Sequence, residues 1–162
     1  MEFKRQKVCP TILEGKVKMK IDGECHCGKI AYQAEVDPDT VLICHCTDCQ
    51  ITSGSPYRTG IPAPAESFVM LRGEPKIYIK TAESGFKRAH GFCSDCGTPI
   101  YACAPTNPNV YGLRMGAIKQ RAELHSPRWQ VWCRSALPWA MDLNAVEKHD
   151  RQPGFLTEKL RS

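Results

Sequence analysis

Seven of the ten cysteines in this 162-residue chain fall in three short groups, and cysteine thiolates are zinc ligands. Cysteines this close together rarely form unstrained disulfides, because a disulfide requires a specific separation and direction of its two Cβ atoms. They can instead converge on one metal ion from a tight turn. The groups are Cys25-x-Cys27, Cys44-x-Cys46-x2-Cys49 and Cys93-x2-Cys96.

The seven cysteines divide naturally into four and three, which predicts two different zinc sites. The four-cysteine cluster combines the two pairs: Cys25, Cys27, Cys93 and Cys96. A zinc ion with four thiolates is closed and structural. The three-cysteine cluster consists of Cys44, Cys46 and Cys49. A zinc ion with three protein ligands keeps one position open for water or substrate. The sequence therefore predicts two zinc ions per chain, one structural and one with access for a ligand.

The segment Phe92–Thr98 has the form of a zinc knuckle, with Gly97 directly after its second cysteine. A glycine there lets the backbone turn so that amide N–H groups point at the sulfurs. Cys27-Gly28 repeats this feature at the first pair. A C-x2-C motif can also be a redox dithiol, but that interpretation requires a βαβ setting, which this sequence lacks.

The other histidines and cysteines have no such spacing. His45 and His26 each lie between two predicted ligands in extended chain, where a side chain is expected to point away from the metal. Three further histidines are conceivable ligands, but we interpret them as ordinary surface or strand residues: His90, His125 and His149. The remaining cysteines are expected to be small core residues in two cases and a tail thiol in the third: Cys103 and Cys133, then Cys9.

Alternating polar and apolar residues predict a mainly β domain with few short helical turns. Lys16–Ile21 and Ile30–Val36 alternate strictly, and the first cysteine pair lies in the loop between them. A helical turn capped by Thr47 or Asp48 should carry Cys49 and stop at Ser53-Gly54-Ser55-Pro56. Further strands are expected at 41–43, 68–71, 76–80, 87–92, 100–104, 110–115 and 129–133. We expect one zinc-binding domain over residues 16–150, after an extended leader (1–15) and before a tail (151–162).

Composition and charge narrow the class of protein. No run approaches the roughly 18 apolar residues of a membrane helix, and the charged N-terminal residues do not resemble a secretory signal. We therefore expect a cytoplasmic location, where thiols stay reduced; a secreted disulfide protein is the alternative. The net charge is +5, with lysines near the N-terminus that either attract an anionic partner or form a solvated tail and strand face. No aromatic residues lie among them, so nucleic-acid binding is not expected.

With these motifs the chain resembles the glutathione-dependent formaldehyde-activating enzyme (GFA) family, whose domain also occurs in centromere protein V. The resemblance runs from about Ile21 to Trp139. Its motifs are Gly23-x-Cys25-x-Cys27-Gly28, Cys44-His45-Cys46-x2-Cys49 with Ser53-Gly54, Phe92-Cys93-x2-Cys96-Gly97-Thr98 and Pro138-Trp139.

The resemblance implies a β-tent fold of stacked antiparallel sheets, a structural zinc on the four-cysteine cluster and a catalytic zinc on the three-cysteine cluster. It also implies carbon–sulfur bond chemistry, in which formaldehyde and glutathione form S-hydroxymethylglutathione. Two features depart from the family. Gln130 stands where many members carry a histidine, and the region from Pro56 to Ser84 matches only in length and general character.

Two functions follow as hypotheses. The first is a zinc-dependent carbon–sulfur lyase acting on a small thiol adduct, with Asp48 or His45 as the proton-transfer residue. The second is a non-enzymatic, zinc-stabilised binding module for a protein or nucleic-acid partner. The zinc content distinguishes them, because two zinc ions, one of them lost readily to a chelator, favour the enzyme. The sequence leaves the thiol, the aldehyde and the oligomeric state open.

Overall fold

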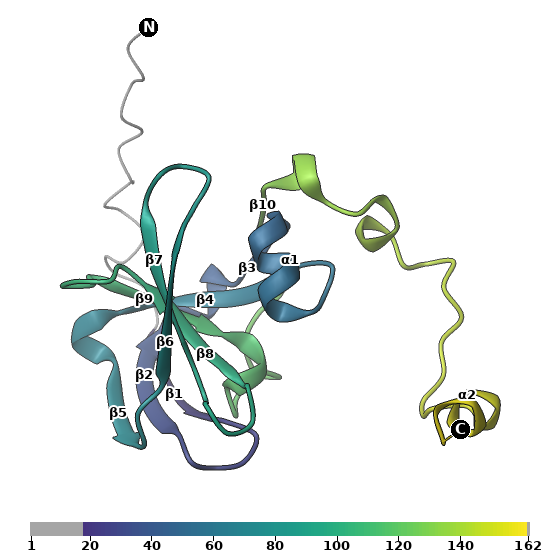
Figure 1. The fold of residues 1–162 in the computed structure, drawn as a ribbon, viewed down its shortest axis with the longest axis horizontal. Coiled ribbons are helices and arrows are strands. Elements are labelled where there is room, and N and C mark those ends of the chain that lie inside the picture. Colours follow the sequence, from purple (N-terminus) through teal and green to yellow (C-terminus); the bar gives the residue numbers. More distant parts are fainter. Residues whose placement is uncertain (1–17, 162) are drawn as a thin grey trace, which may run out of the picture.

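The computed structural model describes residues 18–161, which fold into two β-sheets with short helical segments (Figure 1). Within this range there are ten strands and two α-helices, so the mainly β prediction is confirmed. The strands are β1 (Met19–Glu24), β2 (Ala31–Val36), β3 (Leu42–Cys44), β4 (Arg58–Pro64), β5 (Val69–Arg72), β6 (Lys76–Thr81), β7 (Lys87–Phe92), β8 (Pro99–Cys103), β9 (Val110–Arg114) and β10 (Trp129–Val131). The predicted leader and Cys9 lie outside the described residues.

The larger sheet has seven strands in the order β10-β3-β4-β9-β8-β7-β6. Its neighbours are antiparallel except for β10 and β3, which run parallel. The order differs from the chain order at β4–β9 and at β10–β3, so residues far apart in sequence become neighbours. Cys44 faces Arg58 across β3 and β4, and Gly60 faces Arg114 across β4 and β9.

The smaller sheet has the order β1-β2-β5, with all pairs antiparallel. The core joins it to the larger sheet: Tyr32 of β2 and Ile61 and Leu113 of the larger sheet belong to one buried cluster. Phe68 stacks on Tyr111 with the ring centroids 4.3 Å apart and also contacts Tyr32 and Tyr101. Offset aromatic contacts of this kind stabilise the packing beyond simple burial of area.

The α-helices are short and lie outside this core. Helix α1 (Thr47–Ser53) follows β3 directly, and Gly54 ends it in the left-handed conformation at φ 63°. Helix α2 (Gly154–Arg161) lies well away from the sheets, at the end of an extended segment (Figure 1). Several 3-10 turns connect the strands: Pro38–Thr40, Ala65–Ser67, Met115–Ala117, Cys133–Ser135 and Pro138–Met141.

Most predicted strands are present with small shifts of their ends, but β4 was not predicted. Its sequence contains Pro62 and Pro64, which lack the N–H that a central strand donates. Strand β3 pairs only with residues 58–60 of β4, so both prolines lie where β4 has β9 as its one ladder neighbour. The segment therefore behaves as an edge at its C-terminal half, where proline is tolerated.

The strands predicted at 68–71 and 76–80 join different sheets, because β5 pairs in the smaller sheet and β6 lies at the edge of the larger one. One smaller expectation needs correction. The N-cap of α1 is Cys46, not Thr47 or Asp48: its sulfur accepts a hydrogen bond from the Cys49 N–H at 3.4 Å. The capping atom is therefore one of the predicted metal ligands.

Candidate functional site

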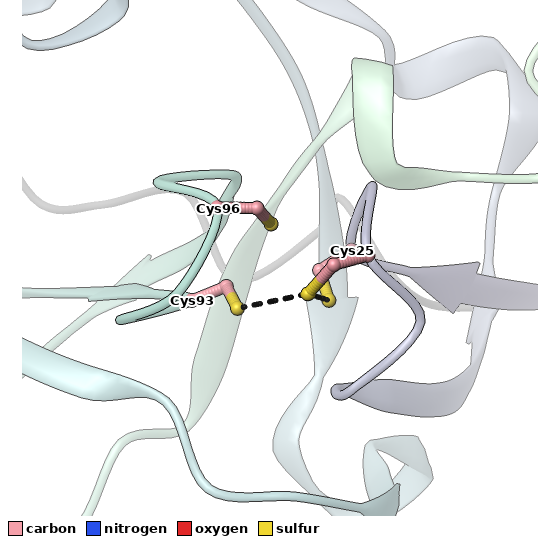
Figure 2. Close-up of side chains that lie close together, drawn as sticks. Cys25, Cys93 and Cys96 are labelled. Carbon is pink, nitrogen blue, oxygen red and sulfur yellow. Dashed lines mark hydrogen bonds between the residues drawn. The ribbon is translucent and has the colours of Figure 1, made fainter.

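The four-cysteine cluster has the geometry of a tetrahedral thiolate site. Its four sulfurs lie within 4.8 Å of one another. The sulfur of Cys27 is 3.6 Å from that of Cys25 and 3.7 Å from that of Cys93. A zinc ion with bonds of about 2.3 Å to a tetrahedron of sulfurs requires separations of about 3.8 Å. Figure 2 shows the labelled sulfurs turned toward one another from two facing loops. The donor set and its spacing fit zinc.

The two loops that carry this cluster fold in the same way. The N–H of Cys25 donates to the carbonyl of Ile30 at 3.0 Å, and the N–H of Cys93 donates to the carbonyl of Thr98 at 2.9 Å. Each loop contains a glycine with positive φ, Gly28 at 76° and Gly97 at 72°. The resulting turns direct N–H groups at sulfur, as the bond from Ile30 N to Cys25 Sγ at 3.2 Å illustrates. Such bonds stabilise the thiolate form that binds a metal.

Direct contacts also join the two loops. The hydroxyl of Thr98 accepts from the N–H of His26 at 3.1 Å and lies 3.1 Å from the sulfur of Cys96. Hydrogen bonds from the Thr98 side chain and backbone hold the pKa of Cys96 at about 5. The ammonium of Lys29 pairs with the carboxylate of Asp95. One loop links β1 and β2 and the other links β7 and β8, so this cluster connects the two sheets.

The three-cysteine cluster is built from one short stretch of chain. Cys44 ends β3, Cys46 caps α1 and Cys49 lies in the first turn of α1. Their sulfurs lie within 4.8 Å of one another, and each residue is partly buried. Because only two residues separate the end of β3 from the start of α1, the three side chains turn to a common point. This donor set also fits zinc, with a fourth position not supplied by cysteine.

The three thiols of this cluster differ in the direction of their pKa shifts. A hydrogen bond from the Cys49 thiol lowers the pKa of Cys44, and the same contact, together with burial, raises the pKa of Cys49. Burial raises the pKa of Cys46. The thiol of Cys44 is therefore easier to ionise than those of Cys46 and Cys49, and a bound divalent cation would favour the thiolate form of all three.

His45 is not among the potential ligands whose atoms lie together in the three-cysteine cluster. Its ring is buried, its Nε2 lies 2.9 Å from Oε1 of Gln130, and Tyr57 packs edge-on at 5.5 Å between ring centroids. Gln50 of α1 donates to the His45 carbonyl at 2.7 Å and to the Ser135 carbonyl at 2.8 Å. Gln130, one of the two departures from the family pattern noted in the sequence, is thus the side chain that His45 contacts.

A pocket of about 470 Å³ lies beside α1 and the larger sheet. It extends from Thr52 of α1 to residues that flank the zinc knuckle. Its lining consists of Thr52, Arg58, Lys76, Ile77, Tyr78, His90, Gly91, Phe92, Gly97, Pro99, Tyr101 and Arg114. Thr52 lies one helical turn after Asp48 and three residues after Cys49, so the pocket and the three-cysteine cluster share an element.

Arg58 connects the pocket to the cluster. It faces Cys44 across β3 and β4 and is only 5% exposed. Its Nη2 donates to Thr52 Oγ1 at 2.6 Å, and its Nη1 lies 3.3 Å from Nδ1 of His90. A guanidinium has no acceptor, so His90 Nδ1 must accept and its Nε2 carries the proton. Burial and neighbouring positive charges lower the pKa of His90 to about 4, so the ring is neutral at physiological pH.

A profile of the family "Glutathione-dependent formaldehyde-activating enzyme" matches residues 20–135, which include all seven clustered cysteines. The chain belongs to this family. A Schizosaccharomyces pombe protein named as an uncharacterized lyase is 28% identical over 98 residues, covering 60% of this chain and 68% of that protein.

A solved structure supports the fold assignment. The crystal structure of a Rhodobacter sphaeroides protein superposes with a TM-score of 0.52 at 20% identity, covering 67% of this chain and 98% of the other. At this identity the similarity concerns the fold. The C-terminal segment with α2 lies beyond the residues that the GFA family profile matches.

The structure places the other sequence candidates away from the two clusters. Cys103 is buried, as expected, but Cys133 is exposed, so its assignment to the core was wrong. It sits in the 3-10 turn after β10, where no sheet covers it. His125 pairs with Asp39 at 2.7 Å and His149 with Glu147 at 3.1 Å. Among residues 18–161 no helix is long and apolar enough to cross a membrane.

Sequence reasoning missed the pocket residues Arg58, His90 and Arg114. Alternation within 87–92 could have placed His90 on the opposite face from Ala89, but it could not show what that face meets. Asp48, a predicted proton-transfer residue, forms an ion pair with Lys80.

Proposed function

We propose that this chain is a zinc-dependent carbon–sulfur lyase that acts on a small thiol adduct such as S-hydroxymethylglutathione. The observation that carries the proposal is the convergence of three cysteine sulfurs beside a pocket, on the same helix that contributes Thr52 to its wall. The family name and the lyase name of the yeast relative support the same reaction class. The four-cysteine cluster is proposed to hold a structural zinc.

The reaction breaks one carbon–sulfur bond. In the adduct R–S–CH2–OH, the hydroxyl proton leaves oxygen as the carbonyl forms, and the bond electrons remain on sulfur, which ends as a thiol. The reverse direction joins the thiol to the aldehyde. A zinc ion on the three-cysteine cluster would supply an open position that binds the thiol sulfur as a thiolate. With three thiolates that centre carries one negative charge, which favours thiol binding over strong activation of water.

The residues around the cluster can assist at defined atoms. Arg58 places a buried positive charge beside Cys44, where negative charge gathers on sulfur. His90 lines the same pocket and has Nε2–H to donate to a hydroxyl or carbonyl oxygen. Asp48 is paired with Lys80 and His45 contacts Gln130, whereas the Nε2–H of neutral His90 is free to hold the adduct oxygen by a hydrogen bond; the hydroxyl proton then leaves to solvent and the sulfur is protonated from solvent.

The test measures both metal and turnover. Purified protein should contain two zinc ions and should accelerate exchange between 13C-labelled formaldehyde and S-hydroxymethylglutathione, measured by exchange NMR at equilibrium. Cys46→Ser protein is the matched control, because serine keeps the N-cap of α1 but removes a ligand. If wild type is no faster than this control for every thiol adduct tested, the lyase proposal is wrong. The binding-module hypothesis would then be favoured.

A further inference from the structure

The pocket beside the three-cysteine cluster has an uneven charge distribution. Its lining contains three cations, Arg58, Lys76 and Arg114, and no aspartate or glutamate. Lys76 is exposed at the rim, whereas Arg58 is buried and Arg114 is partly buried. A concave site lined by positive charges concentrates anionic ligands.

The strand register brings the two arginines close together. Arg58 and Gly60 lie on the same face of β4, and Gly60 pairs with Arg114 of β9. Arg58 and Arg114 are therefore diagonal neighbours on adjacent antiparallel strands, a separation that long side chains span easily. Cys44 faces Arg58 from the other side, so the order across the sheet is sulfur, Arg58, Arg114.

Neither guanidinium has a carboxylate partner among the ion pairs of the described residues. Arg58 contacts the neutral groups of Thr52 and His90, and the Nε of Arg114 is buried without a hydrogen-bond partner within residues 18–161. Asp48, one helical turn before Thr52, already pairs with the largely buried Lys80.

The charge balance of the pocket favours a ligand that carries an anionic group. A zinc ion with three thiolates would neutralise one of the two arginine charges. The sulfur of an intact adduct is neutral, so the second guanidinium would still lack a counter-charge. A buried cation without a partner is costly, and a planar guanidinium binds carboxylate oxygens in pairs.

We propose that Arg58 and Arg114 bind a carboxylate on the thiol half of the substrate, so that the enzyme selects adducts of acidic thiols over adducts of neutral ones. This inference rests on the proposed lyase function and names its substrate class. Glutathione, with two carboxylates, belongs to that class, and so do other small thiol acids. The anchored carboxylate would hold the adduct with its sulfur toward Cys44 and its neighbours.

The first experiment changes the ligand and leaves the protein intact. Exchange rates are compared for the formaldehyde adducts of glutathione and of glutathione diethyl ester, which differ in charge at the carboxyl groups. We expect kcat/KM for the acid to exceed that for the ester by at least about tenfold, or about 1.4 kcal/mol. Equal rates for the two adducts would overturn the carboxylate subsite and leave the lyase function standing.

The second experiment changes the protein and measures binding without turnover. S-methylglutathione, whose sulfur cannot ionise, is titrated by calorimetry into zinc-loaded wild type, Arg114→Gln and Arg58→Lys. We expect the Kd to rise about tenfold or more in Arg114→Gln. Arg58→Lys keeps a positive charge in case the buried arginine is needed for folding. Arg88→Gln is the matched control, because Arg88 lies on β7 of the same sheet but does not line the pocket.

The outcomes separate the two proposals. Weaker binding in Arg114→Gln, with the control unchanged, supports the subsite even if no adduct is turned over, in which case only the lyase function fails. Unchanged binding in both arginine variants overturns the subsite. An equal loss of affinity in Arg88→Gln would also overturn the subsite. That result would mean that the overall charge of the protein, and not contact in the pocket, attracts the ligand.

Discussion

The two cysteine clusters use the same ligand type but occupy opposite kinds of position in the fold. The four-cysteine cluster joins loops about 70 residues apart and belonging to different sheets. The three-cysteine cluster comes from six consecutive residues between β3 and α1. Two residues of the first cluster, Cys25 and Cys93, are buried, whereas every member of the second is partly exposed.

This difference in position predicts that the four-cysteine cluster stabilises the fold, whereas the three-cysteine cluster is available to bind a ligand. A metal that bridges distant segments opposes unfolding of the whole domain, because its ligands assemble only in the native chain. A metal held by a local segment contributes mainly to that segment, and its exposed side remains open to a ligand. We therefore expect a cysteine-to-serine substitution to lower the stability of the protein far more in the four-cysteine cluster than in the three-cysteine cluster.

The largest effect is expected for Cys93→Ser. Structural zinc binding contributes on the order of 10 kcal/mol to folding, which is comparable to the total stability of a domain. We expect the variant to be unfolded or insoluble and to lack metal. Circular dichroism and zinc analysis test this. Wild-type melting behaviour in soluble Cys93→Ser protein would show that this cluster is not structural.

Cys46→Ser should remain folded while losing one zinc ion and the proposed activity. Serine accepts the hydrogen bond from the Cys49 N–H as Cys46 does, so the helix cap is retained. Cys46→Ala removes both the ligand and the cap and should be about 1 kcal/mol less stable than Cys46→Ser. Thermal melting and metal content distinguish the two. Unfolding of Cys46→Ser as complete as that of Cys93→Ser would erase the contrast between the clusters.

Glycine-to-alanine substitutions compare the backbone strain that each cysteine cluster tolerates in the turn beside it. Gly54 after α1 and Gly97 in the knuckle have φ of 63° and 72°, and neither has an atom that a new Cβ would meet within 4 Å. Alanine should therefore cost about 1–2 kcal/mol at each, from left-handed strain. Gly116, with equal space but without positive φ, is the control and should change stability by less. A much larger loss at Gly97 would mean that strain there disrupts metal binding.

Acid should act on the pocket through His90. The pKa of folded His90 is lowered to about 4, whereas an unfolded histidine titrates near 6.5. Between these values the unfolded chain binds more protons, so this residue's contribution to stability is full above about pH 6.5 and is lost as pH falls toward 4. Zinc-loaded His90→Gln should lack this part of the pH dependence in denaturant titrations. Parallel curves for wild type and variant would contradict the assignment.

The sequence predicted the cysteine clusters correctly because their information is local. Spacing and following glycines determine how a tight turn presents sulfur, and both loops fold accordingly. Alternation similarly located strands such as β2 and β7, since the period of two survives in any half-buried strand. The proline-containing β4 was missed because tolerance of Pro62 and Pro64 depends on how far its neighbour β3 extends.

The sequence by itself determined which cysteines cluster, the resemblance to the family and most strands. The tertiary structure decided what surrounds the second cluster. Arg58, His90 and Arg114 lie on three strands that are not consecutive in the chain, and only the strand order β3-β4-β9-β8-β7 places them along one pocket. No local pattern encodes that order, because it follows from burial of Tyr32, Ile61 and Leu113 in a common core. Local spacing therefore predicts the cysteine clusters, whereas the packing of the sheets determines which residues line the pocket beside the three-cysteine cluster.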